Sequence, residues 1–363
     1  MGVSAGEVRA ALDAAYPREW AASWDAVGRV SGADDLEIET VLLAVDPPKL
    51  VIDEAVDRGA GMVVVHHPLH LHAVHGLKPG GVLEQCAKAG IALDVVHTNG
   101  DVARPGTSDT LWSAIGLDGD PDAIEPGPPD VLDLMHVYVP QADRDRLIAA
   151  LAAAGAGRIG DYEDCAYVTS GHGQFRPGLE ANPATGEVGE LERVSEDRVE
   201  MVASPALRDM LTGVLRSTHP YEEPAFGFSS ISQPNRRGFG RVGDVTELSF
   251  GDLVSKVSAG LNLSEGQLRH AGLLGTERVG RVAVAAGAGD DAIEAAAAHG
   301  AQVLVTSDLR HHRSRDALDL GLALIDVPHW SAEWPWLAEL SRVISEATTV
   351  ETVISTICTA PFR

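Results

Sequence analysis

The chain begins and ends with stretches that alternate short, almost continuously apolar runs with amphipathic helical runs, and this alternation restricts its fold more than any other feature. In the first stretch, the apolar runs that predict strands lie at 39–47, 61–68 and 91–101. Such runs are typical of strands covered by helices on both faces. The same alternation returns in 277–359. We therefore expect an α/β fold in which two similar α/β halves form one body.

A different pattern separates these two stretches. Residues 118–130 are acidic and rich in proline and glycine, and 232–244 are again rich in turn-forming residues, as domain boundaries often are. Between them the predicted elements follow the order β-α-β-β-α-β, which is that of a ferredoxin-like (α+β) domain. The predicted organisation is a first α/β half at 1–128, an inserted ferredoxin-like domain at 129–233 and a second α/β half at 234–363.

The composition argues against several classes of partner. The chain has 363 residues, with 53 Asp and Glu against 28 Lys and Arg, which gives a net charge of −25 with neutral histidine. Nucleic acids and anionic membranes bind proteins through clustered Lys and Arg, so neither is an expected partner. No apolar run is long enough to predict a membrane span. Three separated cysteines and the lack of a signal-peptide pattern predict a cytoplasmic protein.

Three predicted strands end in side chains that are common metal ligands. His66 and His67 follow one strand, His97 and Asp101 follow the next, and His329 follows a third, with Glu333 four residues further on. In parallel α/β sheets, ligands gather beyond the carboxyl ends of the strands. Imidazole and carboxylate groups suit zinc, iron, manganese or nickel, and carboxylates can bridge two ions. The residue types and their positions together predict a site for divalent metal ions.

The local spacing is compatible with two ions. Consecutive side chains of an extended segment point to opposite sides, so His66 and His67 could each face a different ion. His329 and Glu333 could share one face of a helix at i, i+4. The simpler interpretation is that each histidine is an isolated polar residue at a strand end. That interpretation stays open for any one of them, but three such strand ends together favour the metal site.

Other features have a structural explanation as well as a functional one. Three further histidines are predicted to lie in a surface loop over the site: His70, His72 and His75. The pair His311-His312 lies between two arginines and forms either an anion contact or the solvated start of a helix. The glycine-rich segment 285–293 is most simply a tight turn, because it lacks the full GxGxxG spacing of a Rossmann-type dinucleotide binder.

Two hydrophobic features of the sequence bear on the core and on the site. Cys86 lies within an amphipathic helix and is a predicted core residue. Three tryptophans follow His329, and they either pack inside the fold or form a wall of the pocket: Trp330, Trp334 and Trp336.

On these residues the chain resembles the Nif-three-like family, whose members carry the name of GTP cyclohydrolase I type 2 homologues. The resemblance covers nearly the whole chain, and it is carried by SWDAVGRVSG (23–32), VVVHHPL (63–69), VVHTNGDVARPGTSDTLW (95–112), GFGRVGD (238–244), and the segments 281–312 and 322–333. The paired-histidine motif followed by the late histidine–glutamate motif is specific to this family. One departure from the family pattern is Gly100, where leucine is usual.

The resemblance implies a site for two metal ions between the two α/β halves. Matched residue by residue, the family's metal ligands fall on the set suggested by the strand ends: His66, His67, Asp101, His329 and the bridging Glu333. His97 lies in a matched motif and is expected behind the ligands, where it would orient Asp101 or a water molecule. The insert resembles PII and CutA-type signalling folds through HPYEEPA (219–225). Members with this architecture form toroidal hexamers built from trimers, so a homohexamer is implied.

Two functions fit these expectations. The first is a metal-dependent hydrolase that acts on a nucleotide or another small phosphorylated or heterocyclic molecule, with two divalent ions as cofactors and Glu333 and His97 as catalytic residues. Asp308 is a further candidate for proton transfer. The alternative is a non-catalytic metal-binding protein with a regulatory or scaffold role, which the resemblance of the insert to signalling folds supports.

Overall fold

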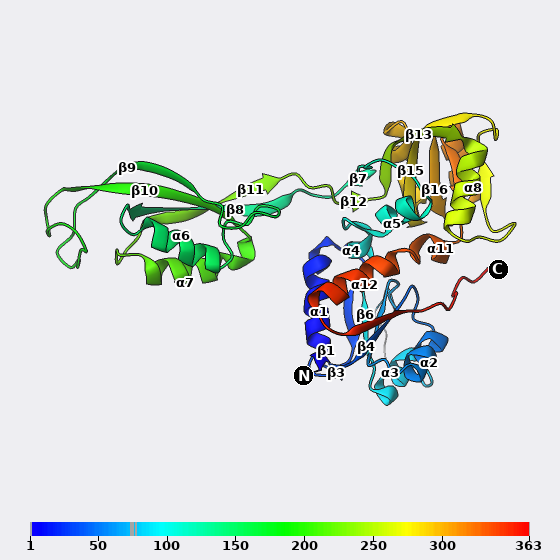
Figure 1. Ribbon diagram of the computed structural model, residues 1–363, viewed down its shortest axis with the longest axis horizontal. Helices are drawn as coiled ribbons and strands as arrows, with labels where there is room; N and C mark the ends of the chain where they lie inside the picture. The colour runs from blue at the N-terminus through cyan, green and yellow to red at the C-terminus, as the bar shows by residue number, and fades with distance from the viewer. Residues whose placement is uncertain (1, 73–75, 77, 363) are drawn as a thin grey trace. The chain divides into compact units, whose positions relative to one another are not determined.

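The computed structural model describes residues 2–72, 76 and 78–362. The chain forms two compact units, which are a body made of residues 1–127 and 236–363 and an inserted unit made of residues 128–235. These boundaries lie within two residues of the predicted ones. The body is α/β, and it contains two five-stranded sheets (Figure 1).

The first sheet of the body has the strand order β18-β4-β5-β6-β2. Its strands are β2 (Gly28–Ser31), β4 (Thr40–Ala44), β5 (Met62–Val65), β6 (Ala92–Val95) and β18 (Glu351–Ile354). β18, β4, β5 and β6 run parallel, and β2 is an antiparallel edge strand. Helices α1 (Ala5–Ala15) and α12 (Trp336–Ala347) cover one face, while α2 (Lys49–Asp57) and α3 (Val82–Ala89) cover the other.

Burial on both faces follows directly from the sequence of the strands. In β4, Val41 and Leu43 pack with α1 and α12, whereas Leu42 packs with α2 and α3. The two faces alternate along the strand, as the period of two residues requires. Cys86 of α3 is fully buried in the second of these clusters, which confirms its predicted core position.

The second sheet has the strand order β13-β15-β16-β17-β14, with a parallel centre and two antiparallel edge strands. Its strands are β13 (Arg241–Ser249), β14 (Arg269–Ala271), β15 (Arg278–Ala288), β16 (Val303–Ser307) and β17 (Ala323–Asp326). Helices α8 (Phe250–Gly260) and α5 (Thr107–Ala114) cover one face, and α9 (Ile293–Ala298) and α10 (His311–Asp319) cover the other. The short helix α11 (His329–Glu333) follows β17.

The two halves exchange elements, which the sequence did not predict. Helix α5 precedes the insert in sequence, yet Leu111 and Trp112 pack in the core of the second sheet. In return, α12 and the parallel strand β18 complete the first sheet from the C-terminal part of the chain. An amphipathic pattern shows that a helix buries one face, but it does not show which sheet covers that face.

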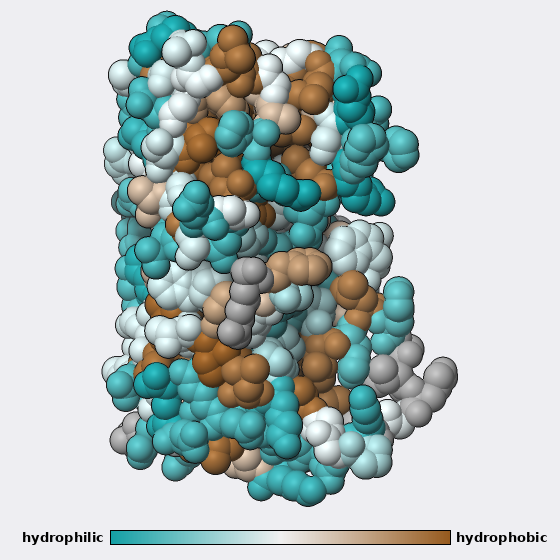
Figure 2. All heavy atoms as spheres, turned by 90° about the vertical axis from the view of Figure 1, so that its right-hand side faces the viewer, coloured by the Kyte–Doolittle hydropathy of each residue, from teal (hydrophilic) through white to brown (hydrophobic). Residues whose placement is uncertain are grey.

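The remaining short elements of the body connect these layers. They are β1 (Val3–Ser4) paired with β3 (Glu37–Ile38), β7 (Glu125–Pro126) paired with β12 (Gly238–Phe239), helix α4 (Thr98–Asp101), and 3₁₀ turns at Arg18–Trp20 and Asp290–Ala292. On the face drawn in Figure 2, hydrophobic side chains lie in small groups between hydrophilic ones. No helix in the described part of the chain is long and apolar enough to cross a membrane.

The inserted unit has the predicted element order. It consists of β8 (Asp130–Pro140), α6 (Arg144–Ala153), β9 (Tyr167–Phe175), β10 (Glu192–Ala203), a 3₁₀ turn at Pro205–Leu207, α7 (Arg208–Thr218) and β11 (Phe226–Gln233). The strands form an antiparallel sheet in the order β11-β8-β10-β9. Both helices lie on the same side of this sheet, and their leucines pack against alternate residues of β8 and β10 (Figure 1). The other face of the sheet carries no helix of this unit.

Candidate metal centre

Three neighbouring strand ends bring the predicted ligands together. His66 and His67 follow β5 directly, and His97 follows β6 by two residues at the start of α4. His329 begins α11, three residues after β17 ends. Because α11 also contains Glu333, the imidazole and the carboxylate share one helical face, as the i, i+4 spacing predicted. Ligand-type side chains from both sheets of the body therefore converge on one place.

Glu333 lies at the centre of this group. Its Oε1 is 2.8 Å from Nε2 of His329 and 3.5 Å from Nε2 of His66, while its Oε2 is 3.1 Å from Nε2 of His67. The side chain of Glu333 is only 4% exposed. A buried carboxylate is costly without compensating charge. Its two oxygens face different histidines, which is the arrangement that a bridging carboxylate needs.

His66 presents a ligand atom without a partner. Its Nδ1 lies 2.9 Å from the carbonyl oxygen of Val96, so Nδ1–H donates there and the lone pair remains on Nε2. That Nε2 is buried and makes no hydrogen bond. It lies 3.5 Å from Oδ1 of Asp101, which in turn accepts a 2.7 Å hydrogen bond from the hydroxyl of Thr107. His66 and Asp101 are thus fixed with their ligand atoms directed toward each other.

His97 lies closer to the ligands than expected. One of its ring nitrogens is within 4.8 Å of ligand atoms of both His66 and His67. A second group with the same spacing consists of His67, His329 and Glu333. The two groups share His67, and no ion has to be assumed for this geometry. The described residues therefore contain two overlapping sets of donors.

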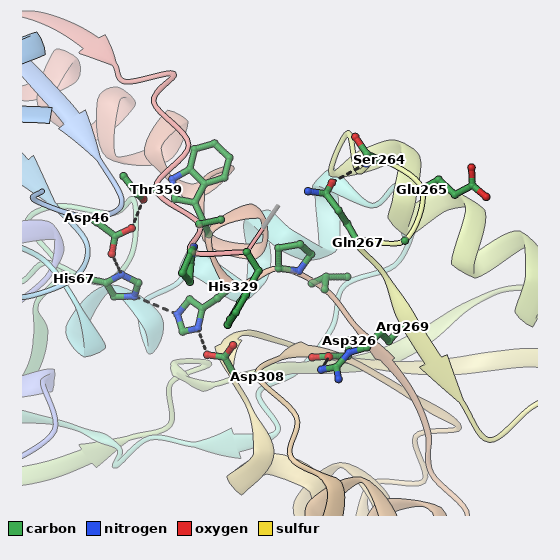
Figure 3. A pocket seen from close by; sticks show the side chains of 17 residues that line it. Asp46, His67, Ser264, Glu265, Gln267, Arg269, Asp308, Asp326, His329 and Thr359 are labelled. Atoms are coloured by element: carbon green, nitrogen blue, oxygen red, sulfur yellow. Dashed lines mark hydrogen bonds and ion pairs between the residues drawn. The ribbon is translucent and has the colours of Figure 1, made fainter. Parts of the chain in front are cut away.

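Three carboxylates orient three of the histidines. Asp46 Oδ1 lies 2.7 Å from Nδ1 of His67, Asp25 Oδ1 lies 2.9 Å from Nδ1 of His97, and Asp308 Oδ2 lies 2.6 Å from Nδ1 of His329. In each pair Nδ1–H donates to the carboxylate, which leaves Nε2 as the ligand atom. A carboxylate is a usual hydrogen-bond partner for the second ring nitrogen of a metal-binding histidine. Figure 3 shows the row formed by Thr359, Asp46, His67, His329 and Asp308.

Sequence reasoning missed the orienting role of Asp25 and Asp46 and considered Asp308 only for proton transfer. A signal was present for two of them. Asp46 follows β4 and Asp308 follows β16, so both lie at the same edges of the sheets as the histidines. The strand-end rule that selected the histidines also applies to these aspartates. Asp25 lies in a loop before β2, and only its place in the stretch SWDAVG could have drawn attention to it.

The electrostatics of the group reflect excess negative charge. Burial alone would lower the pKa of His67. The charge of Glu333 and the hydrogen bond between His67 and Asp46 instead raise that pKa to about 10. The pKa of His329 is likewise raised to about 9, by Glu333 and Asp308 against the effect of burial. Burial would raise the pKa of Glu333, but the neighbouring His66 and His67 hold it well below its ordinary value. The carboxylates of this site thus stabilise cations beside them.

The backbone approaches the ligands closely at one glycine. Gly287 at the end of β15 has φ +74°, and a Cβ atom there would lie 2.5 Å from Oε1 of Glu333. Within the segment 285–293, the chain leaves β15 at Ala288 and passes through the 3₁₀ turn at Asp290–Ala292 into α9, which agrees with the simpler prediction of a tight turn from strand to helix. Asp308 also has a positive φ, of 58°, which is unusual for a residue with a side chain. Such strained conformations cluster at functional sites, and this one holds the carboxylate that orients His329.

A cavity of about 800 Å³ opens beside His67 and His329. It is formed by the loop 264–269, the residues that follow β17, and the C-terminal segment 359–362 (Figure 3). Its size is in the range of small-molecule sites. The half-buried Trp330 lines it, whereas Trp336 is fully buried and packs edge-on against His66. Trp330 therefore forms a wall of the pocket, whereas Trp336 packs inside the fold.

The other histidines singled out in the sequence lie outside the centre wherever the structure describes them. His70 and His72 are exposed, which agrees with a surface loop, while His75 lies outside the described residues. His311 begins α10, and its flanking arginines bind carboxylates. Arg310 pairs with Asp290, and Arg313 lies 2.7 Å from Glu294. Because the arginines already have anionic partners, this geometry favours the solvated helix start over the anion contact.

The donor set fits divalent transition metals. Imidazole nitrogens and carboxylate oxygens suit zinc, iron, manganese and nickel alike. Two buried atoms of the group, Nε2 of His66 and Oε2 of Glu333, have no hydrogen bond of good geometry. Buried polar atoms without partners are rare in folded proteins and call for an explanation such as an ion. The residues present can therefore hold metal.

Comparisons with known proteins point to one family over nearly the whole chain. The sequence profile of Duf34/NIF3 (NGG1p interacting factor 3) matches residues 3–361. A protein of Mycobacterium tuberculosis named "GTP cyclohydrolase 1 type 2 homolog" is 40% identical over 100% of this chain and 97% of its own. One of Bacillus subtilis with the same name is 35% identical over 87% of this chain and 85% of its own.

Solved structures show the same architecture. A Bacillus cereus protein described as related to NIF3 superposes with a TM-score of 0.87 at 30% identity, covering 99% of this chain and 98% of its own. A Staphylococcus aureus protein superposes with a TM-score of 0.79 at 27% identity, covering 100% of this chain and 98% of its own.

Proposed function

The chain belongs to the Duf34/NIF3 family, and from that premise we propose that it is a metal-dependent hydrolase with two divalent ions per chain. The observation that carries the proposal is the convergence of buried donor atoms on Glu333. Its oxygens lie 2.8 Å from Nε2 of His329 and 3.1 Å from Nε2 of His67. The name shared by the relatives supports a nucleotide or another small phosphorylated or heterocyclic substrate.

The residues divide into ligands and groups that orient them. His66, His67, Asp101 and His329 would hold the ions, with Glu333 between them. When bound, two divalent ions supply Lewis-acid chemistry, which acidifies water and polarises a substrate oxygen. Asp46 and Asp308 keep Nε2 of their histidines free by accepting the proton of Nδ1.

His97 is the proposed residue for proton transfer. Burial and the nearby His66 lower its pKa, so its imidazole is neutral at pH 7. Asp25 accepts from Nδ1, which leaves Nε2 able either to bind an ion or to accept a proton. A position within 4.8 Å of the ligand atoms of His66 and His67 suits both tasks.

The cavity beside His67 and His329 is the proposed substrate site. Trp330 offers an aromatic face there, and Gln267 offers an amide that can donate and accept. Arg269, which pairs with Asp326, brings a guanidinium to the rim. An aromatic face with polar groups around it suits a heterocycle that carries a charged substituent.

The wider assembly is also a proposal. We infer a cytoplasmic homohexamer of toroidal shape, built from trimers, by resemblance to family members with an insert. The β-α-β-β-α-β order of residues 128–235 and their antiparallel sheet support a ferredoxin-like, PII/CutA-like insert. The three free cysteines are compatible with a reducing compartment.

Metal analysis combined with activity measurement tests the proposal. Protein purified without chelators should contain, or take up, close to two transition-metal ions per chain. Glu333→Gln should lose most turnover and reduce the metal content, while Glu39→Gln, at an exposed position, should change neither. Absence of bound metal after anaerobic purification and metal addition would contradict the metal site.

The alternative function has a separate outcome. If the metal-loaded protein turns over no member of a panel of nucleotides and phosphoesters, the hydrolase is rejected and a regulatory or scaffold role is favoured. In that case Glu333→Gln should lose metal but keep binding to a protein partner, provided that its circular dichroism spectrum is unchanged.

A further inference from the structure

The inserted unit contains a cavity of its own, of about 410 Å³, far in sequence from the metal centre. Side chains alternate along β8 and β10, and Val137 and Val199 pack under the helices. Tyr138 and Glu196 lie at positions of the opposite parity and so point away from α6 and α7. The cavity therefore lies toward the face of the sheet that the helices of this unit leave open (Figure 1).

Three aromatic side chains form walls of this cavity, namely Tyr138, Phe175 and Tyr221. The ring centroids of Phe175 and Tyr221 are 6.0 Å apart. His219 fixes Tyr221 beside β8, because its Nε2 lies 2.9 Å from the carbonyl oxygen of Tyr138 and its Nδ1 accepts from the backbone N–H of Tyr221 at 3.0 Å. The motif HPYEEPA, which the proposed metal chemistry does not use, thus builds part of this wall.

A loop closes over the aromatic walls. Residues 177–185, between β9 and β10, contribute further lining, and the backbone N–H of Asn182 donates to Oε1 of Glu222 at 3.0 Å. This hydrogen bond joins the loop to the segment that carries Tyr221. The cavity is thereby bounded by three separate parts of the unit.

Two carboxylates at the cavity, those of Glu196 and Glu222, form no ion pair with a Lys, Arg or His among the described residues. Glu196 extends across Gly173, where a Cβ atom would lie 2.0 Å from Oε2, so a side chain at 173 would displace the carboxylate from this position. Of the acids around it, Glu222 accepts the hydrogen bond from the backbone N–H of Asn182, Glu223 pairs with Arg216, and Glu200 pairs with Arg198. Among the described residues, no Lys, Arg or His forms an ion pair with Glu196. The carboxylate and burial also raise the pKa of Tyr221, with burial the larger effect.

We propose that this cavity binds a small organic cation of the alkylammonium or quaternary ammonium class, with its charge at Glu196 and its apolar groups against Tyr138, Phe175 and Tyr221. Aromatic faces attract cations through their quadrupole, and such rings recognise quaternary ammonium groups in other proteins. A divalent metal is a poorer fit, because no group of three metal-ligand side chains was found at this cavity among the described residues. The acidic lining opposes an anion.

Choline and its neutral isostere 3,3-dimethylbutan-1-ol test the proposal on the full-length protein by isothermal titration. Choline should bind to one site per chain, and the isostere at least about tenfold more weakly, because it has the same shape without the charge. Equal binding of the two compounds would overturn the proposal, as would absence of saturable choline binding.

Variants locate the binding site. Glu196→Gln and Phe175→Leu should each weaken choline binding by about tenfold or more, whereas Glu190→Gln, at an exposed position of the same loop, should not. Metal content should be unchanged in all three, which separates this site from the metal centre. If Glu196→Gln fails to fold, Phe175→Leu still decides. If Glu196→Gln and Phe175→Leu both bind choline as well as the unaltered protein does, the ligand binds elsewhere and the assignment of this cavity is wrong.

Discussion

At the scale of single residues, Gly100 shows how a buried aromatic ring restricts its neighbour. A Cβ atom at Gly100 would lie 2.8 Å from Cζ2 of Trp336, which is fully buried between the first sheet and the metal centre. The indole thus occupies the space that a side chain at position 100 would need. The ring also packs edge-on against His66, with centroids 5.3 Å apart.

Gly100→Ala should therefore destabilise the body by about 1–3 kcal/mol, the usual cost of overpacking a core. Gly275→Ala is the matched control, since a Cβ there meets no atom closer than 4.0 Å and should change stability by less than about 0.5 kcal/mol. Urea unfolding followed by tryptophan fluorescence measures both. A Gly100→Ala protein as stable as the control would show that Trp336 can move aside.

The orienting aspartates are expected to affect metal affinity. Asp46→Asn and Asp308→Asn should each weaken metal binding by about 10–100-fold, because an amide holds the histidine less firmly and in a less basic state. Asp57→Asn, at an exposed position of α2, is the control. Competition with a chromophoric chelator measures the affinities. Equal affinity in all variants would mean that the histidines are oriented by their packing alone.

The raised pKa values of two histidines predict proton release on metal binding. In the metal-free protein His67, with a pKa of about 10, and His329, with a pKa of about 9, are protonated at pH 7. An ion binds the neutral imidazole, so binding must displace these protons. Metal affinity should therefore rise with pH up to about 9–10. Titration calorimetry in buffers of different ionisation enthalpy should detect net proton release, and buffer-independent heats would contradict it.

At the scale of elements, one arginine joins β13 to the segment before the insert. Arg241 is fully buried, and its guanidinium binds Asp109 of α5 through two contacts of 2.8 and 2.6 Å. It also donates to the carbonyl oxygens of Gly238, Gly240 and Ala103. These bonds tie α5 to the second sheet, which explains how a helix from the first part of the sequence is held there.

Arg241→Met should destabilise the body by about 3–5 kcal/mol, because it removes the bidentate partner of a largely buried carboxylate and leaves Asp109 only the longer 3.6 Å contact with Arg104. Arg29→Met is the control, since Arg29 pairs with Asp34 at the surface and such pairs contribute about 1 kcal/mol or less. Thermal unfolding by circular dichroism compares the two. A small effect of Arg241→Met would indicate that water or another cation replaces the guanidinium.

Sequence periodicity predicted most elements, but not their partners. The apolar runs at β4, β5, β6 and β16 predicted strands because each is buried on both faces. The ligand set followed from the strand-end rule, which needs only the chain direction of a parallel sheet. The exchange of α5 and α12 between the halves could not be foreseen, since it depends on which hydrophobic surfaces meet. The orienting role of Asp25 depends on a loop conformation that no pattern encodes.

At the scale of the whole molecule, the two segments of each unit that lead to the other unit pair with each other. In the body, β7 pairs with β12, and the N–H of Gly127 donates to the carbonyl oxygen of Arg237 at 2.9 Å. In the inserted unit, Asp130 of β8 lies opposite Gln233 of β11. Each unit therefore has its two chain ends side by side.

Deletion of residues 128–235, with a short turn joining Gly127 to Arg236, should leave a folded body. It should keep the metal content of the full chain, because every proposed ligand lies outside the deleted segment. Circular dichroism and metal analysis measure these two properties. An unfolded or metal-free product would mean that the body needs the insert for folding, contrary to the separate cores found in the two units.

Because strands pair on both sides of each boundary, the inserted unit is a separable part of the chain. Removal or replacement of the insert at this point leaves the strand pairing of the body intact, because β7 and β12 pair with each other and with no strand of the insert. Because each unit has its own hydrophobic core, a substitution at the proposed cation site of the insert need not disturb the metal centre of the body.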